Sequence, residues 1–132
     1  MGTRSNTIVI DANKPLMNLY RQMDGYPSGH GAELAAFLTN LKMVNGIGGG
    51  KCRIANGAGC LAAQIVAHFK DGPGGFYIAP IDQRDNDYTY LISCSTMDPD
   101  HGILVTVLTW EEMVFSGTVQ EFVTFCNAKP SK

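Results

Sequence analysis

The sequence predicts an α+β domain in which an antiparallel sheet carries its helices on one face. Short β-branched or alternating segments, typical of strands, are separated by turns rich in glycine and proline. Two segments in the first half repeat apolar residues at three- and four-residue spacing, which is typical of amphipathic helices. The expected order is ββ-αα-ββ-β-α, in a single ligand-binding domain that spans residues 1–132.

A hairpin is expected at the start of the chain. Residues 3–11 contain the β-branched run 7–10, which favours a strand. Residues 13–15 supply turn-forming side chains, and residues 16–22 return as the second strand.

Two helices are expected next, over residues 31–43 and 60–70. Their apolar stripes are Leu34, Phe37, Leu38 and Leu41 in the first helix, and Leu61, Ile65, Val66 and Phe69 in the second. Strands then follow over 75–80, 87–94 and 103–110, with a further short strand over 112–116. Thr118 and Glu121 form a capping box, which predicts a final helix over 118–126.

Composition narrows the class of protein. Hydrophobic residues make up 45% of the chain and charged residues 17%, which are values of a globular domain. A protein that coats a nucleic-acid polymer needs a basic face, and the net charge of −2 argues against such a protein. No apolar run approaches the ~20 residues of a spanning helix, and the start of the chain lacks the apolar stretch of a signal peptide. We therefore expect a cytoplasmic protein that binds neither membranes nor nucleic-acid polymers.

The four cysteines are expected to be free thiols. None forms a Cys-x-x-Cys pair, and no histidine stands at metal-ligand spacing from any of them. The sequence therefore predicts neither a metal nor another cofactor.

The segment 20–31 is the first candidate site, because it joins a strand to a helix with residue types that a plain turn does not need. Arg21 and His30 are suited to donate hydrogen bonds to an anion, and Tyr20 and Tyr26 are suited to stack on a ring. The helix that begins here adds free amides that favour an anion. The alternative is a rigid loop packed by its own tyrosine, with either Tyr20 or Arg21 in the core.

The glycine-rich segment 44–59 is the second candidate, as a flexible cover over the first. It does not match the phosphate-binding P-loop pattern, because Lys51 is followed by Cys52 rather than Ser or Thr. It also lacks the preceding buried strand of a dinucleotide-binding fold.

A cysteine hydrolase is the enzymatic alternative. Cys60 follows a glycine-rich turn at the expected start of a helix, a position that lowers the pKa of a thiol. His101 precedes a later strand, so the order of the two residues resembles that of papain-like and cell-wall amidase enzymes. The Asp-Cys-Ser-Gly signature of those amidases is absent, and Cys60 also fits simple helix packing.

Several strings carry a family resemblance. They are MGTRS at the start, YRQMDGYPSGHG at 20–31, NGAGCLAAQ at 56–64 and HFKDG at 68–72. Together they resemble a family of small uncharacterised proteins of bacteriophages and bacteria, over roughly the first 80 residues. The resemblance carries no activity of its own. By type only, the chain is similar to phage sponges, which sequester cyclic nucleotide or cyclic ADP-ribose immune signals in an oligomeric pocket without cleaving them.

These observations favour a non-catalytic, homo-oligomeric binding protein for a small anionic, nucleotide-like ligand. The alternatives are the hydrolase based on Cys60 and His101, and a phage structural or interaction module without a small ligand. The expected ligand-binding residues are Arg4, Tyr20, Arg21, Asp24, Tyr26, His30, Asn45, Gly48, Gly49, Lys51 and Asn56.

Overall fold

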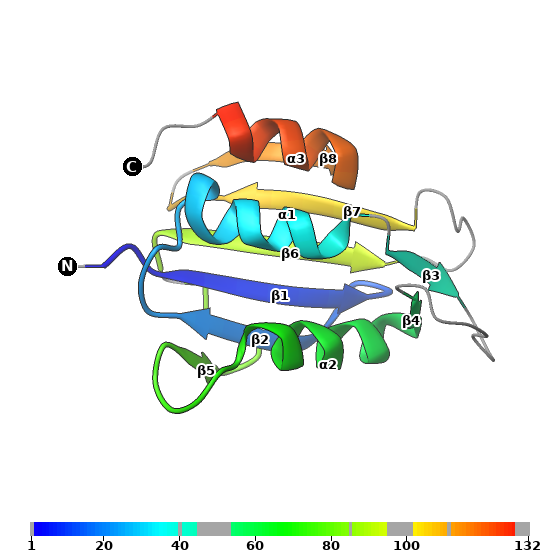
Figure 1. Cartoon of the computed structure of the whole chain (residues 1–132), viewed down its shortest axis with the longest axis horizontal. Helices are drawn as coiled ribbons and strands as arrows, with labels where there is room; N and C mark the ends of the chain where they lie inside the picture. The colour runs from blue at the N-terminus through cyan, green and yellow to red at the C-terminus, as the bar shows by residue number, and fades with distance from the viewer. Residues whose placement is uncertain are drawn as a thin grey trace.

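The computed structural model describes residues 2–39, 41–44, 54–84, 86–94, 102–110 and 112–128. They form an α+β fold, as predicted, in which the helices cover one face of a six-stranded sheet of order β5-β2-β1-β6-β7-β8 (Figure 1). The strands of this sheet are β1 (Ser5–Asp11), β2 (Lys14–Arg21), β5 (Phe76–Ile78), β6 (Tyr88–Cys94), β7 (Ile103–Leu108) and β8 (Met113–Thr118). The helical elements are a single π-helical turn η1 (Pro27–Gly31), α1 (Ala32–Leu38), α2 (Gly57–Phe69) and α3 (Val119–Ala128).

The predicted hairpin is confirmed as the antiparallel pair β1 and β2. Its two turn residues, Ala12 and Asn13, have φ angles of 51° and 67°. Left-handed conformations at both turn positions match the twist of the flanking strands, which is why such two-residue turns close hairpins.

The prediction of a wholly antiparallel sheet is wrong at one pair, because β1 and β6 run parallel, from Ser5 beside Tyr88 to Asp11 beside Cys94. After the hairpin the chain forms α1, α2 and the edge strand β5 before it enters β6. Strand β6 then runs in the same direction as β1. Parallel neighbours require such a long crossover. A strand pattern in the sequence indicates which positions are buried, but not the direction of the neighbouring strand.

Several element boundaries also differ from the prediction. The first helix ends at Leu38 rather than at Met43, and Thr39 turns the chain into extended backbone with ψ of 130°. Residues expected at the end of that helix form β3 (Lys42–Val44), which pairs with β4 (Ile54–Asn56) in a separate parallel two-stranded sheet. The second helix begins at Gly57, three residues earlier than expected, and β8 completes the six-stranded sheet.

The main core lies between the sheet and the helices. The predicted stripe residues Leu34, Leu38, Leu61 and Ile65 are at most 1% exposed, and they pack with Tyr90 from β6. The capping box of α3 is confirmed: the Thr118 N–H donates to Glu121 Oε1 at 2.9 Å, and the Glu121 N–H donates to Thr118 Oγ1 at 3.2 Å. Among the described residues, no helix is long and apolar enough to cross a membrane.

The connection from β2 to η1 is packed tightly against β1. The Gly25 N–H donates to the Thr3 carbonyl at 2.8 Å. A Cβ atom on Gly25 would lie 2.8 Å from Ser5 Cβ and 2.9 Å from the Arg4 carbonyl carbon. A Cβ atom on Gly29 would lie 2.6 Å from the Asp24 carbonyl oxygen. These glycines are therefore needed for close backbone approach, and not for contact with a ligand.

We expect Gly25→Ala to lower the free energy of unfolding by about 1–3 kcal/mol, because the new methyl group would press on backbone atoms of β1. Denaturant unfolding measures this change. The matched control is Gly59→Ala in α2, where nothing lies within 4 Å of the new Cβ atom. The control should be neutral or up to about 1 kcal/mol more stable, since alanine favours a helix over glycine. Equal stability of the two variants would contradict the packing account.

Candidate functional site

His30, an expected ligand-binding residue, is instead enclosed in the core and fully buried. Its Nε2 atom lies 2.7 Å from Thr7 Oγ1, and its Nδ1 atom lies 3.1 Å from Arg21 Nη1. A guanidinium group can only donate, so Nδ1 accepts and the ring proton is on Nε2, which donates to Thr7. Both ring nitrogens are thus occupied by the protein, and none of the ring is open to a ligand.

The surroundings of His30 keep it neutral. The ring packs against Phe69 at 4.9 Å and Tyr90 at 5.3 Å between centroids. Burial, and then the charge of Arg21, lower the pKa of His30 from 6.5 to about 3. An imidazole that is uncharged and out of reach does not bind an anion.

Arg21 is also engaged within the protein. Its Nε atom donates to the Met23 carbonyl at 2.7 Å, and Nη1 donates to Glu33 Oε1 at 2.8 Å. The guanidinium carbon lies 5.0 Å from the centroid of the Phe76 ring, and the side chain is only 13% exposed. The positive charge of Arg21, which was expected to pair with a ligand, therefore pairs with Glu33.

The predicted clamp of Arg21, Tyr26 and His30 is therefore not assembled as a ligand site. The Tyr26 hydroxyl donates to Asp24 Oδ1 at 3.3 Å, and the negative charge of Asp24 raises the pKa of Tyr26. Asp24 itself has a left-handed backbone with φ of 63°, and its carbonyl accepts from the His30 N–H at 2.8 Å. The rigid-loop alternative describes this segment better than the clamp.

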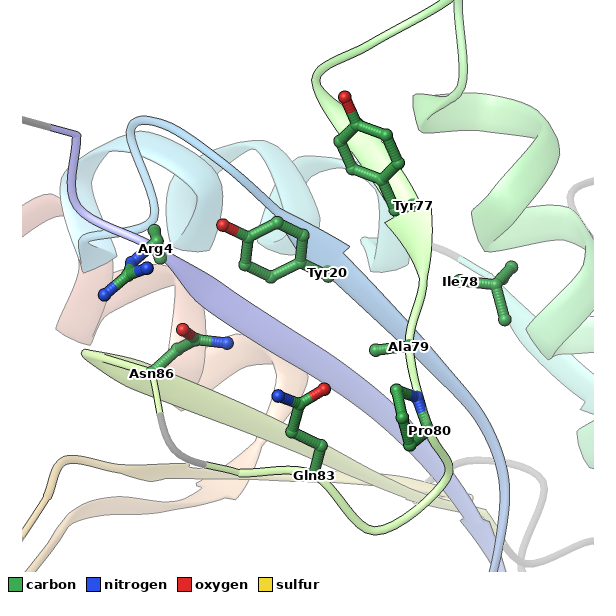
Figure 2. Close-up of a pocket in the computed structure, with 8 residues that line it drawn as sticks. All are labelled: Arg4, Tyr20, Tyr77, Ile78, Ala79, Pro80, Gln83 and Asn86. Atoms are coloured by element: carbon green, nitrogen blue, oxygen red, sulfur yellow. The ribbon is translucent and has the colours of Figure 1, made fainter.

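A pocket of about 360 Å³ lies on the face of the sheet opposite the helices (Figure 2). Tyr20 lies in the middle of the lining side chains, with Arg4 and Asn86 on one side and Tyr77 on another. The lining residues are Arg4, Tyr20, Tyr77, Ile78, Ala79, Pro80, Gln83 and Asn86. Two of the expected ligand-binding residues, Arg4 and Tyr20, are thus brought together here.

Strand alternation explains why Tyr20 and Arg21 are separated. Neighbouring residues of a strand point to opposite faces of the sheet. Leu19 and Arg21 face the helical core, where Leu19 is 2% exposed, whereas Tyr20 faces the pocket. Arg4 lies just before β1 and reaches the same face as Tyr20 (Figure 2).

A chain of three buried asparagines holds the floor and one wall of the pocket in place. Asn86 Nδ2 donates to Asn6 Oδ1 at 2.7 Å, and Asn6 Nδ2 donates to Asn18 Oδ1 at 2.8 Å. Asn18 Nδ2 then donates to the Pro80 and Gln83 carbonyls, at 2.7 and 2.9 Å. This asparagine chain ties Pro80, Gln83 and Asn86 to β1 and β2. Buried amides without such partners would be costly, so the chain fixes the shape of the pocket.

The pocket presents an aromatic surface beside a positive charge. The rings of Tyr20 and Tyr77 lie 6.0 Å apart at an interplanar angle of 39°, and Tyr77 is 48% exposed. The Arg4 backbone is fixed by its N–H, which donates to Asp87 Oδ2 at 3.0 Å. Its guanidinium forms no ion pair with any described residue. Asn86 Oδ1 likewise has no hydrogen-bond donor among the described residues, so it is a free acceptor at the pocket.

The remaining expected residues do not join this pocket within the described ranges. Asn45, Gly48, Gly49 and Lys51 of the expected covering segment lie outside the described residues, as does His101. Asn56 is the exposed last residue of β4, directly before α2. Cys60 is half-buried in the first turn of α2, with its Sγ atom 3.6 Å from Gln64 Oε1. The hydrolase alternative based on Cys60 and His101 therefore stays a hypothesis, because only Cys60 lies within the described residues.

No protein-family model, curated protein or solved structure matches the chain. The described residues also contain no group of three or more His, Cys, Asp or Glu side chains that could hold a metal ion.

Tyr77, Gln83 and Asn86 were not among the expected site residues. Tyr77 lies in the strand expected over 75–80, and Gln83 and Asn86 lie between it and the strand expected over 87–94. A signal was present in the strands: Asn18 interrupts the apolar run of β2, and Asn6 directly precedes the β-branched run of β1. Polar residues at such positions require partners, and those partners come from the loop that lines the pocket.

Acid should destabilise the fold through His30. Above about pH 7 the ring is neutral in both the folded and unfolded states, so it has no effect. Below pH 6.5 the unfolded state binds a proton that the folded state does not bind until about pH 3. This costs the folded state about 1.4 kcal/mol for each pH unit between about pH 6 and pH 4.

The direct measurement is an NMR titration of the His30 ring, which should show no protonation down to pH 4. Denaturant unfolding of His30→Gln, which lacks the titrating ring, should show a correspondingly shallower loss of stability with acid. A His30 ring that titrates near pH 6.5 would contradict the buried hydrogen-bonded arrangement.

Proposed function

We propose that this protein is a non-catalytic binding protein for a small anionic, nucleotide-like ligand, held in the pocket of Arg4, Tyr20 and Tyr77. The observation that carries the proposal is a pair of aromatic rings, the half-buried Tyr20 and the exposed Tyr77, beside a guanidinium group that has no ion-pair partner among the described residues. Aromatic rings supply a surface on which a base can stack, and arginine is well suited to phosphate.

The contrast between the two arginines supports this assignment. Arg21 is held by Met23, His30 and Glu33 on the helical side of the sheet, and has the environment of a structural residue. Arg4 is exposed and is fixed only through its backbone on the other side. An anion that reached Arg4 would gain an ion pair without breaking one inside the protein.

The chemistry of the lining residues favours holding the ligand over converting it. Among the described residues that line the pocket, none is a carboxylate, an imidazole or a thiol. General acid–base and nucleophilic catalysis usually depend on such groups. Retention without turnover is the behaviour of the phage sponges that the sequence is similar to by type. A cytoplasmic homo-oligomer remains part of the proposal.

The proposal is tested by incubating the protein with a panel of nucleotides and nucleotide signals, then removing unbound compounds and denaturing the protein by heat. Mass spectrometry of the released material should recover the bound compound intact. Recovery of a converted product would overturn the non-catalytic assignment. The absence of any bound compound across the panel would overturn the binding function.

Two substitutions should weaken the binding of whichever nucleotide is retained. Arg4→Gln should raise its dissociation constant roughly 10- to 150-fold, the equivalent of a charge-assisted hydrogen bond of about 1.5–3 kcal/mol. Tyr77→Leu keeps an apolar side chain but loses the ring, and should raise it roughly 5- to 150-fold, since stacking contributes about 1–3 kcal/mol per base. Isothermal titration calorimetry measures both changes.

The matched control for Arg4→Gln is Lys14→Gln, which removes the same charge from an exposed position at the far end of β2. Its dissociation constant should stay within about twofold of the unaltered protein at physiological salt, because distant exposed charges are screened. Equal weakening by both substitutions would show that the overall charge, and not Arg4, determines binding.

A further inference from the structure

We infer that the pocket is built for a ligand with one base and one phosphate, that is, a linear or cyclic mononucleotide rather than a dinucleotide. This inference rests on the proposed function and makes its ligand class specific. Three properties of the pocket support it: its size, its number of free cations and the spacing of its tyrosines.

The pocket is small for a ligand site. Its volume of about 360 Å³ lies near the lower end of the range of roughly 300–1,000 Å³ that small-molecule pockets span. A pocket of this size can enclose one base with its sugar and phosphate. A second nucleotide of similar size would extend beyond this volume.

Among its described lining residues the pocket offers a single cation, since Arg84, although next in sequence to a lining residue, is exposed and does not line it. Arg4 is the one positively charged residue among the described residues that line it. The nearby Lys70 is engaged elsewhere: its Nζ atom donates to the Phe76 carbonyl at 2.6 Å and the Gly74 carbonyl at 3.1 Å. One guanidinium group can pair with one phosphate in a bidentate manner. A dinucleotide would therefore find no second cation among the described lining residues for its second phosphate.

The two tyrosines form one continuous aromatic surface. Their ring centroids are 6.0 Å apart, within the distance at which aromatic rings contact one another. A base therefore has no room between Tyr20 and Tyr77, and stacks on the outside of the pair. This arrangement accommodates one base and not two.

The asparagine chain adds a feature that a sugar or base would satisfy. Every link from Asn86 to Asn18 donates in the same direction, so the chain starts at Asn86 Oδ1, which has no donor among the described residues. Hydrogen bonds in series polarise one another, which makes this oxygen a better acceptor. It lies on the same side of the pocket as Arg4 (Figure 2). A ligand with a hydroxyl or amine donor near its phosphate, as a ribonucleotide has, would match both groups.

The test is calorimetric titration of the full chain with separate classes of probe. The probes are nucleoside 5′-monophosphates, cyclic mononucleotides, cyclic dinucleotides, cyclic ADP-ribose, the parent nucleosides and inorganic phosphate. We expect one mononucleotide per chain, bound at least about tenfold more tightly than its nucleoside, than phosphate alone or than any cyclic dinucleotide, which is a difference of about 1.4 kcal/mol. The linear and cyclic probes distinguish the two forms of mononucleotide.

Arg4→Gln provides the second readout, because it should abolish the preference for the mononucleotide over its nucleoside, whereas Lys14→Gln should retain it. Tighter binding of a cyclic dinucleotide or cyclic ADP-ribose than of every mononucleotide would overturn this inference and leave the proposed function intact. Binding of none of the nucleotide probes would overturn both.

Discussion

The buried imidazole of His30 is the interaction on which the rest of the structure depends. Through its two nitrogens it joins Thr7 of β1 to Arg21 of β2, and Arg21 extends the connection to Glu33 of α1. The same ring fills the space between Phe69 of α2 and Tyr90 of β6. Four elements and the turn η1 therefore meet at one uncharged ring. Because both ring nitrogens of His30 have partners within the protein, the ring helps to fix the helices over the sheet instead of offering contacts to a ligand.

The two faces of the sheet therefore have different roles. The helical face carries the core and uses Arg21 and His30 for structure. The opposite face carries a second polar assembly, the asparagine chain, which holds residues 79–84 and 86 beside β1 and β2 and leaves Arg4, Tyr20 and Tyr77 accessible. Both assemblies meet in β1, whose residues Asn6 and Thr7 point to opposite faces and are both fully buried. The helices leave this second face of the sheet uncovered, and the pocket of Arg4, Tyr20 and Tyr77 lies there.

Local patterns in the sequence predicted the α+β class, the hairpin, the apolar stripes of two helices and the capping box, because each depends on residues close together in the chain. The parallel pairing of β1 with β6 could not be predicted in the same way, since it depends on the path of the whole intervening chain. The site prediction was partly successful for a related reason. Arg4 and Tyr20 do lie in one pocket, but Arg21 and His30 were assigned to the same site by residue type, although strand alternation places Tyr20 and Arg21 on opposite faces. Tyr77, Gln83 and Asn86 come from distant segments and were found only in the folded chain.

The central claim is that a ligand binds on the open face of the sheet and leaves the His30 cluster untouched. Amide and side-chain NMR shift mapping during titration with the tightest-binding mononucleotide tests this most directly. The account predicts that the shifted signals belong to Arg4, Tyr20, Tyr77 and residues 79–84 and 86, while the ring signals of His30 stay in place. Shifts centred on Tyr26 and His30, with the pocket signals unchanged, would contradict it and restore the segment 20–31 as the binding site.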